Sequence, residues 1–562
     1  MNEEIVSSPL DGHFAALMLR LNGAPNIHLE RAARAVSAWR GAGHTCVPLD
    51  ELGGEDCGES LRACAVVGAP GEARPLILDG AGRLYLQRYW AYETELASAI
   101  RQRLGEAECD GALLARGLAR LFPKAKKTDG QRVAAETAVR KKFCVITGGP
   151  GTGKTYTVAR VLALLAEQFA ATGRPARIAL AAPTGKAAAR MQEAIAQSVT
   201  AMPATEPLRQ MLPGEARTIH RLLGTIPDSP YFRHDRTRPL AVDVVVVDEA
   251  SMVDLALMAK LFAAAPDTAR VILLGDKDQL ASVEAGNVLG DICGTGAAGT
   301  KAPIARHIVE LKKAHRFGAD SGIQRASTLV NAGEIDATLE LLRSGEYPDL
   351  LGAPTPPARA LEATLRPRSL AGFRAFLECA DASEALTRLG DFRILCATRR
   401  CSYGVENLNL LVERILAAEG LIAPESTHYH GRPVLVRTND YSLRLFNGDV
   451  GLILRDPESG DDLRAFFPDA TGAVRRILPT RLPAHETSFA MTVHKSQGSE
   501  FDRVLLVLPD RDTPLATREL LYTGLTRARS AVEIWAGESL LRTAIARRTE
   551  RSSGLREALW GR

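Results

Sequence analysis

A glycine-rich segment near residue 150 contains the residue types that bind phosphate groups. Its members are Gly148, Gly149, Pro150, Gly151, Thr152, Gly153, Lys154 and Thr155. An apolar run, 143–146, precedes it and an amphipathic pattern, 156–162, follows it, which is the strand–loop–helix setting of the phosphate-binding motif G-x-x-x-x-G-K-[ST]. Backbone N–H groups of such a loop point at the phosphates, and the helix dipole favours their charge. The segment therefore predicts a nucleoside triphosphate site, with Lys154 on the β- and γ-phosphates and the Thr155 hydroxyl on Mg²⁺.

Two adjacent carboxylates, Asp248 and Glu249, follow four valines at 244–247. A β-branched run of this kind belongs inside a parallel sheet, so the two acids should lie at the sheet edge where the phosphate loop holds its ligand. We expect Asp248 to bind Mg²⁺, directly or through water, and Glu249 to orient or deprotonate the attacking water. An isolated Asp-Glu pair is more often a solvated strand end, but the position of this pair after a phosphate-binding lysine favours catalysis.

Three further side chains could contact the γ-phosphate. Gln279 lies in a polar turn that follows the apolar run 271–274. Arg316 and Arg527 are candidates because positive charge near the γ-phosphate accelerates phosphoryl transfer. A single arginine is usually surface charge, so these two assignments depend on the order of motifs described below.

The elements that must position these residues alternate between strands and helices. Strands are predicted at 143–147, 178–182, 243–247 and 271–274, and this alternation indicates a parallel sheet with helices on both faces. Ligands bind such sheets at the carboxyl ends of the strands, where the motif loops lie. Apolar runs at 393–397, 503–508 and 532–535 predict a second α/β domain.

Two other segments differ in pattern from these α/β domains. Residues 1–125 contain helical spacing at 13–19 and 29–36 and a hairpin pattern at 75–86, without a catalytic constellation. Residues 425–487 are rich in strand and turn signals and predict a small β-barrel inserted into the second α/β domain.

Composition places limits on the class of protein. A chain of 562 residues needs three or four domains, and a net charge of +4 neither indicates nor excludes a nucleic-acid partner. The nine cysteines form no Cys-x-x-Cys pair and no zinc-ligand spacing, which fits a reducing compartment. The sequence shows no signal-peptide pattern and no apolar run near the roughly 18 residues of a membrane span. We expect a soluble, cytoplasmic protein without a membrane contact.

The order of the motifs resembles that of superfamily 1 DNA helicases. Among them the chain is similar to the RecD type, the alpha subunit of exodeoxyribonuclease V (the RecBCD helicase–nuclease). The matching segments are Gln131, 148–155, 182–188, 218–224, 248–249, 275–279, 316–317, 447–449, 491–501 and 522–529. They cover the chain from about residue 126 to its end. Residues 75–78, 83–90 and 92–93 resemble the N-terminal region of the same alpha subunits.

The resemblance implies a fold of the α/β class. It consists of two RecA-like P-loop motor domains with parallel sheets, a small β-barrel-like insertion in the second, and a separate α+β N-terminal domain. The implied boundaries are 1–125 for a partner-docking domain, 126–330 for the first motor domain, 331–390 for a helical connecting region, 391–424 with 488–562 for the second motor domain, and 425–487 for an SH3-like barrel.

The resemblance also implies roles for matched residues. Gln131 would lie near the adenine of ATP, and Gln279, Arg316 and Arg527 would read the γ-phosphate. Contacts along a groove for single-stranded DNA fall on Thr184, His220, Thr492 and His494. The cofactors implied are ATP and Mg²⁺.

The function implied is that of an ATP-dependent 5′→3′ DNA helicase subunit. It would act in a heterotrimer with the beta and gamma subunits of exodeoxyribonuclease V, which unwinds and degrades double-stranded DNA from its ends in recombinational double-strand break repair. The chain shows no persuasive nuclease cluster, so we expect nuclease activity in a partner.

Two other functions remain open from the residues alone. One is a nucleotide-gated regulatory subunit that controls its partners without productive translocation. The other is a P-loop enzyme that phosphorylates a small molecule, although a two-domain motif series argues against it. Base stacking would need aromatic side chains, and for Tyr231, Phe232, Phe317 and Tyr441 ordinary packing is favoured slightly over stacking.

Overall fold

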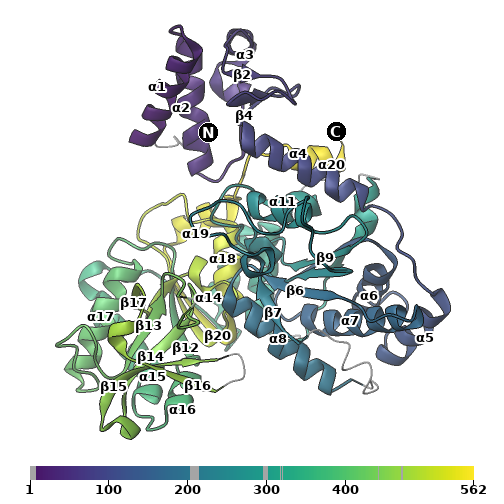
Figure 1. The fold of residues 1–562 in the computed structure, drawn as a ribbon. Helices are drawn as coiled ribbons and strands as arrows, with labels where there is room; N and C mark the ends of the chain where they lie inside the picture. The colour runs from purple at the N-terminus through teal and green to yellow at the C-terminus, as the bar shows by residue number, and fades with distance from the viewer. Residues whose placement is uncertain are drawn as a thin grey trace.

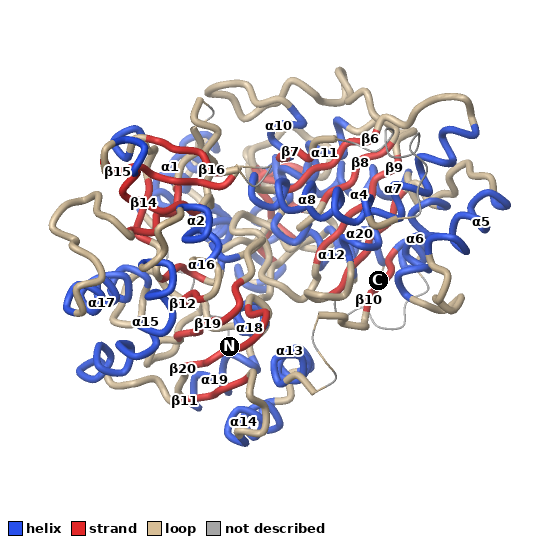
Figure 2. The backbone as a smooth tube through the Cα atoms, turned by 90° about the horizontal axis from the view of Figure 1, so that it is seen from below, coloured by secondary structure: helices blue, strands red, loops and turns tan. Residues whose placement is uncertain are grey.

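The computed structural model describes residues 8–202, 214–294, 302–316, 318, 320–440, 442–469 and 473–561. Two lobes, each built on a parallel sheet, lie side by side, and the N-terminal domain stands above them (Figure 1). Figure 2 shows the strands of the two lobes as separate sheets. Within the described ranges, no helix is long and apolar enough to cross a membrane.

The first lobe contains a six-stranded parallel sheet in the order β10-β5-β9-β8-β6-β7. Its strands are β5 (Phe143–Gly148), β6 (Ile178–Ala182), β7 (Ala216–Thr218), β8 (Val244–Val247), β9 (Arg270–Gly275) and β10 (Ile308–Leu311). The four strands predicted from apolar runs are confirmed, and they occupy the centre of the sheet. The two edge strands, β7 and β10, were not predicted, because short edge strands lack the continuous apolar run of a strand buried on both faces.

Helices cover both faces of this sheet. Along β5, Cys144 and Ile146 face one layer, whereas Phe143 and Val145 face the other, as the alternation of a strand requires. The first layer contains α5 (Gly111–Leu121), α6 (Gly130–Arg140), α7 (Lys154–Ala171) and α8 (Gly185–Thr200). The second contains α4 (Gln87–Gln102), α10 (Ile219–Leu223), α11 (Leu255–Ala264) and α12 (Val288–Cys293).

The second lobe contains a five-stranded parallel sheet in the order β11-β20-β19-β12-β18. Its strands are β11 (Leu350–Ala353), β12 (Phe392–Cys396), β18 (Ala490–Thr492), β19 (Phe501–Val507) and β20 (Ala528–Trp535). One face packs on α13 (Gly322–Ala332), α14 (Ile335–Ser344), α18 (Arg518–Leu525) and α19 (Glu538–Ala546). The other packs on α15 (Leu361–Leu377), α16 (Ala382–Arg388) and α17 (Val405–Ala418).

The segment 331–390 differs from the helical connecting region that the sequence predicts. Strand β11 lies within it and pairs with β20 in the second-lobe sheet. The apolar side chains of α15 and α16 belong to the same core cluster as those of β12. The segment is therefore part of the second lobe, and a four-residue edge strand is too short for the sequence pattern to reveal.

The insertion is an antiparallel five-stranded sheet in the order β16-β15-β14-β13-β17. Its strands are β13 (Arg432–Val436), β14 (Val450–Asp456), β15 (Asp462–Pro468), β16 (Val474–Ile477) and β17 (His485–Thr487). A small apolar cluster of its own includes Val434, Ile453 and Phe467. The predicted strand-rich character of this region is confirmed.

The N-terminal domain combines α1 (Pro9–Asn22), α2 (Ile27–Gly41) and α3 (Gly54–Arg62) with a four-stranded sheet. The strands are β1 (Cys46–Pro48), β2 (Val67–Gly68), β3 (Leu76–Leu78) and β4 (Arg83–Leu86), and the predicted hairpin is the antiparallel pair β3–β4. Helices α4 and α5 pack on the first lobe rather than in this domain, so the predicted boundary near 125 differs from the structure. An amphipathic pattern shows that a helix is buried, but not against which core.

The last helix, α20 (Leu555–Trp560), returns from the second lobe to the first. It lies beside α4 in Figure 1, and Leu555 and Leu559 belong to the first-lobe core. Just before it, the fully buried carboxylate of Glu93 accepts hydrogen bonds from Ser553 Oγ at 2.8 Å and from the Gly554 N–H at 2.9 Å. The C-terminal segment therefore joins the second lobe to the first lobe. It also contacts the N-terminal domain, because the Ser552 carbonyl accepts from the Thr45 N–H at 3.0 Å.

The crossing between the lobes is short. Thr549 Oγ1 donates to Glu519 Oε2 of the second lobe at 2.9 Å. Two residues later, Arg551 Nη1 donates to the Gly286 carbonyl of the first lobe at 2.9 Å. Only Glu550 separates the two attachments.

Candidate nucleotide site between the lobes

The predicted phosphate-binding loop connects β5 to α7. Gly151 and Gly153 have φ angles of +74° and +83°, in the left-handed region that favours glycine. A Cβ atom on Gly151 would collide with the Arg316 side chain, and one on Gly153 would collide with Gln131 Nε2. Glycine is therefore required at both positions by backbone conformation and by close neighbours.

Lys154 and Gln131 are both held against this loop. Lys154 Nζ donates to the carbonyls of Gly148 at 2.6 Å and Gly149 at 3.2 Å. Gln131 Nε2 donates to the Thr152 carbonyl at 3.0 Å. The ammonium group thus lies over the loop, where phosphate oxygens would be stronger acceptors than neutral carbonyls.

The paired carboxylates follow β8. Glu249 has a φ of +51°, a rare conformation for a residue with a Cβ atom, and its N–H donates to Asp248 Oδ1 at 2.8 Å. Burial, together with the charge of Glu249, raises the pKa of Asp248 to about 6, against the opposing charges of Lys154 and Arg190. Two close, half-buried carboxylates of this kind favour the binding of a cation.

Gln279 lies in the loop that follows β9. Its Nε2 donates to Asp276 Oδ2 at 3.1 Å, and both side chains are buried. Its Oε1 is buried without a hydrogen-bond partner among the described residues. Since buried acceptors are normally satisfied, this oxygen can accept from a group that enters the cavity.

The second lobe contributes arginine to the site. Arg527 is nearly buried and donates to the carbonyls of Thr523 at 3.1 Å and Ser499 at 3.2 Å. Arg316 Nη2 donates to Glu500 Oε1 at 2.5 Å, so that a residue just after the first-lobe sheet contacts the second lobe. Both guanidinium groups line the same cavity as Lys154.

Arg190 and Glu500 also line this cavity, although the sequence predicts no role for either. Arg190 Nη1 donates to the Gly498 carbonyl at 2.6 Å, and its Nη2 lies 3.7 Å from Glu500 Oε2. Burial would raise the pKa of Glu500, but the charges of Arg316 and Arg190 hold it below its usual value. Glu500 lies in the matched segment 491–501, and this position could have identified it as a site residue. Arg190 lies just outside the matched segment 182–188.

These side chains surround one cavity of about 400 Å³ between the lobes. The predicted residues that line it are Pro150, Gly151, Gly153, Lys154, Thr155, Asp248, Glu249, Gln279, Arg316 and Arg527. The structure thus brings together residues that are up to 377 positions apart in the chain, from Pro150 to Arg527. Gln131 stands behind the loop, outside the cavity lining.

The four predicted DNA contacts lie outside the lining of this cavity. Thr184 and Thr492 follow or end parallel strands, and each hydroxyl accepts a backbone N–H at 3.2 Å, from Ala187 and Lys495 respectively. Both O–H groups remain able to donate to another acceptor. His494 begins a short 3₁₀ turn after Thr492.

His220 and the proposed aromatic platforms show different environments. His220, in α10, packs edge-to-face against Phe232 with ring centroids 5.7 Å apart, and burial lowers its pKa. Tyr231 is 72% exposed. Phe317 and Tyr441 lie outside the described residues.

A phosphate-binding loop on one parallel-sheet lobe, facing arginines of a second such lobe across a shared cavity, defines a two-lobed P-loop NTPase. Two family models match the corresponding regions: an AAA domain over residues 131–285 and a UvrD-like helicase C-terminal domain over residues 487–534. The chain belongs to the RecD family, as relatives named RecBCD enzyme subunit RecD show.

The relatives cover almost the whole chain. It is 42% identical to the RecBCD enzyme subunit RecD of Mycolicibacterium smegmatis, over 99% of this chain and 98% of the relative. The RecBCD enzyme subunit RecD of Mycobacterium tuberculosis is 43% identical, over 99% of this chain and 96% of the relative. Among solved structures, two coordinating Pif1 helicases at forked double-stranded DNA match 74% of this chain and 94% of that chain at 17% identity, with a TM-score of 0.42.

Proposed function

We propose that the protein hydrolyses ATP to move 5′→3′ along single-stranded DNA, as the helicase subunit of a helicase–nuclease that processes double-stranded DNA ends in break repair. The observation that carries this proposal is the single cavity in which Lys154 and Asp248 of the first lobe meet Arg527 of the second. Relatives named RecBCD enzyme subunit RecD, and a Deinococcus radiodurans relative named ATP-dependent RecD2 DNA helicase that is 32% identical over 85% of this chain, support it.

The groups at this site are suited to bind a nucleotide together with Mg²⁺. Lys154 and the glycine N–H groups are phosphate donors, while the Thr155 hydroxyl and the Asp248 carboxylate are hard oxygen ligands that suit Mg²⁺. When bound, Mg²⁺ neutralises charge on the β- and γ-phosphates. Lys154 exchanges the carbonyls of Gly148 and Gly149 for phosphate oxygens, and Gln131 lies beside the adenine.

Hydrolysis requires a positioned water and stabilised charge. Glu249 accepts a proton from the attacking water, and the unpartnered Oε1 of Gln279 accepts the water's other hydrogen. Arg316 and Arg527 stabilise the charge that develops on the γ-phosphate. Because Arg527 belongs to the second lobe, hydrolysis depends on how the lobes face each other, which links ATP turnover to lobe movement.

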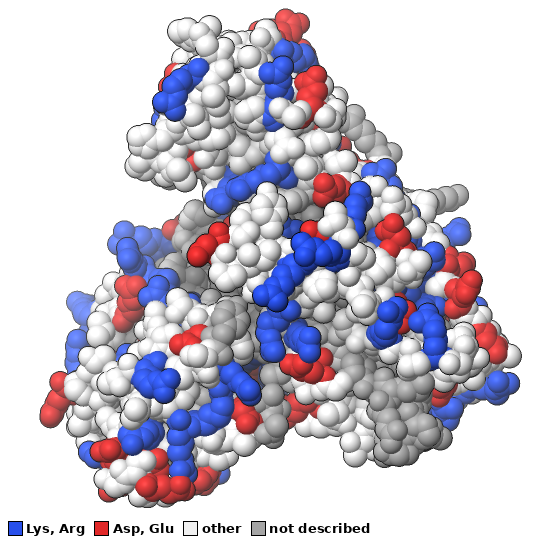
Figure 3. Space-filling view, viewed as in Figure 1, with Lys and Arg blue, Asp and Glu red and all other residues white. Residues whose placement is uncertain are grey.

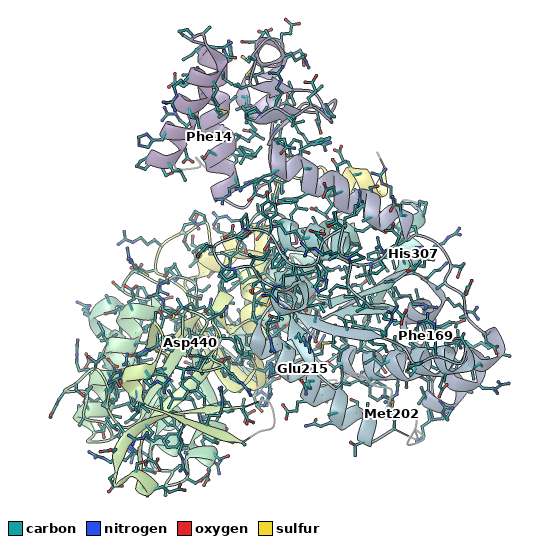
Figure 4. The ribbon with its side chains drawn as sticks, in the orientation of Figure 1. Phe14, Phe169, Met202, Glu215, His307 and Asp440 are labelled. Atoms are coloured by element: carbon teal, nitrogen blue, oxygen red, sulfur yellow. The ribbon has the colours of Figure 1, made fainter. Side chains whose placement is uncertain are left out.

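The strand of DNA runs across both lobes beside Thr184 and His220 of the first and Thr492 and His494 of the second. Exposed arginines at the adjoining edge of the first lobe are Arg217, Arg221, Arg233, Arg236 and Arg238. Figure 3 shows Lys and Arg side chains gathered where β7 lies, and Figure 4 places Glu215, the ion-pair partner of Arg217 and Arg221, at the first-lobe edge nearest the second lobe. Hydroxyl and guanidinium groups of this kind contact the phosphate backbone and position a strand without reading its sequence.

Backbone contacts predict a salt-dependent affinity. Affinity for single-stranded DNA should fall with a logarithmic slope of about 0.7 per neutralised phosphate, or about 50-fold between 50 and 200 mM salt for four phosphates. Fluorescence anisotropy of a labelled oligonucleotide measures this slope. Arg221→Gln should lower it, whereas Arg343→Gln, which removes an exposed ion pair with Glu538, should not. A flat salt response would contradict backbone tracking.

The partners proposed are the beta and gamma subunits of exodeoxyribonuclease V, in a cytoplasmic heterotrimer. The N-terminal domain supports a docking role, because α1 and its neighbour expose Leu10, Leu21 and Ile27 at 69%, 55% and 73%. Exposed apolar side chains on two neighbouring helices provide surface that a partner can bury. No nuclease chemistry is assigned to this chain, and a partner subunit supplies it.

The direction of movement is the decisive test. The chain copurified with its partners should displace a strand from a duplex with a 5′ tail at least tenfold faster than from one with a 3′ tail, after inactivation of the partner helicase. Single-stranded DNA should also stimulate ATP hydrolysis. Equal rates on both tailed duplexes would reject 5′→3′ translocation, and hydrolysis indifferent to DNA would favour phosphorylation of a small molecule instead.

A further inference from the structure

The loop that follows β9 in the first lobe is bonded to the second lobe at both of its ends. At its start, Tyr522 Oη donates to Asp276 Oδ2 at 2.9 Å. At its end, the Leu280 N–H donates to Thr523 Oγ1 at 3.0 Å, and Gln497 Nε2 donates to the Leu280 carbonyl at 2.8 Å. The position of this loop therefore depends on the contact with the second lobe.

Asp276 also determines which way the amide of Gln279 faces. Gln279 Nε2 and Tyr522 Oη both donate to the same oxygen, Asp276 Oδ2, at 3.1 and 2.9 Å. Since Asp276 Oδ2 accepts both hydrogen bonds, the Gln279 amide presents its N–H₂ side to Asp276. The Gln279 Oε1 atom is consequently turned away from Asp276, and it has no hydrogen-bond partner among the described residues of a site whose cavity Gln279 lines.

Tyr522 is fixed in the second lobe, and its hydroxyl reaches the first lobe. It lies in α18, is 5% exposed, and belongs to the second-lobe core. Its hydroxyl also touches the phosphate-binding loop, since a Cβ atom on Gly149 would stand 2.7 Å from Tyr522 Oη. Burial and the charge of Asp276 raise its pKa well above the usual value, so the phenol remains a donor.

We propose that Tyr522 is a positioning residue for ATP hydrolysis: its hydrogen bond to Asp276 fixes the Gln279 amide with Oε1 toward the reacting water when the lobes are in contact. Separation of the lobes removes this donor, and the Asp276 carboxylate and the Gln279 amide are then free to reorient. The proposal rests on the proposed function, because it assigns the Gln279 oxygen to a water in the same cavity. It adds that the orientation of Gln279 Oε1 depends on the contact between the lobes.

Tyr522→Phe removes one oxygen and keeps the ring in the core. In the assembled complex, kcat for DNA-stimulated ATP hydrolysis should fall about tenfold, the effect of losing one hydrogen bond to a charged group at the transition state. The affinity for ATP, measured by equilibrium binding, should stay within twofold. Tyr403→Phe is the matched control, because Tyr403 is a buried second-lobe tyrosine whose hydroxyl donates to the Pro356 carbonyl at 2.8 Å, away from the cavity.

A second variant separates positioning from a general structural effect. If Tyr522 acts through Gln279, Tyr522→Phe should cause no further loss in a Gln279→Ala background. Equal losses in the wild-type and Gln279→Ala backgrounds would overturn the proposal, as would an unchanged kcat for Tyr522→Phe. If the wild-type complex hydrolyses ATP in a Lys154-dependent way but the kcat losses of Tyr522→Phe and Gln279→Ala are additive, only the positioning role of Tyr522 is rejected. Wild-type protein that fails to hydrolyse ATP rejects the proposed function with it.

Discussion

Lys154→Gln is expected to lower ATP hydrolysis and 5′-tailed strand displacement by about 10³-fold or more, because it removes a charge-assisted donor from the phosphates. The structure supports a local effect, since within the described part of the chain Lys154 Nζ donates hydrogen bonds only to carbonyls of its own loop. Initial rates of phosphate release and of strand separation measure the loss in the assembled complex. The partner helicase must be inactivated so that its activity does not mask the effect.

Lys126→Gln is the control for this variant. Lys126 is exposed and lies before α6, away from the cavity, so its charge should not influence hydrolysis. If Lys154→Gln abolished hydrolysis by this subunit but left its 5′-tailed unwinding unchanged, the protein would act as a nucleotide-gated regulatory subunit. No contact in the structure favours that alternative.

Arg527→Ala should reduce kcat about 10³-fold while ATP affinity changes only a few-fold. An arginine supplied from the opposite lobe stabilises charge that is present mainly in the transition state, so its loss affects turnover more than binding. Arg527 meets this condition because it lies in the second lobe, near the end of α18, and lines the cavity with Lys154. Turnover and equilibrium ATP binding should be measured on the same preparation.

Arg518→Ala provides a matched comparison for Arg527→Ala. Arg518 begins α18 and, like Arg527, donates to backbone carbonyls of the second lobe, those of Ile545 and Asn331. It does not line the cavity, so its removal should lower stability without a selective loss of kcat. Comparable losses of ATP affinity and turnover for Arg527→Ala would count against its assignment to the γ-phosphate.

The parts of the fold that follow from local chemistry could be predicted from the sequence. Central strands such as β8, four consecutive valines, are buried on both faces and leave a continuous apolar run. The phosphate-binding loop carries its own requirement for glycine, which the positive φ of Gly151 and Gly153 explains. Strands β7, β10 and β11 were missed, because short edge strands have no comparable signal.

The residues of the site could be predicted where they lie in a recognisable motif. Asp248 and Glu249 follow the end of β8 and Lys154 begins the helix after the loop that follows β5, so a parallel sheet must bring the three together. No role was predicted for Arg190 or Tyr522, because each acts through a contact with a residue of the other lobe that is distant in the sequence. The sequence also did not predict that α4 and α5 pack on the first lobe, because the apolar spacing of one helix does not show which core the helix packs against.

The short C-terminal crossing constrains how the two lobes can move. Thr549 is attached to the second lobe and Arg551 to the first, and two peptide units span at most about 7 Å. While both attachments persist, the lobes cannot slide apart at this point, so any opening of the cleft must be a rotation about it. Because the Ser552 carbonyl, one residue further on, accepts from the Thr45 N–H of the N-terminal domain, that domain is attached next to the pivot, where angular motion of the motor produces the least displacement of whatever docks there.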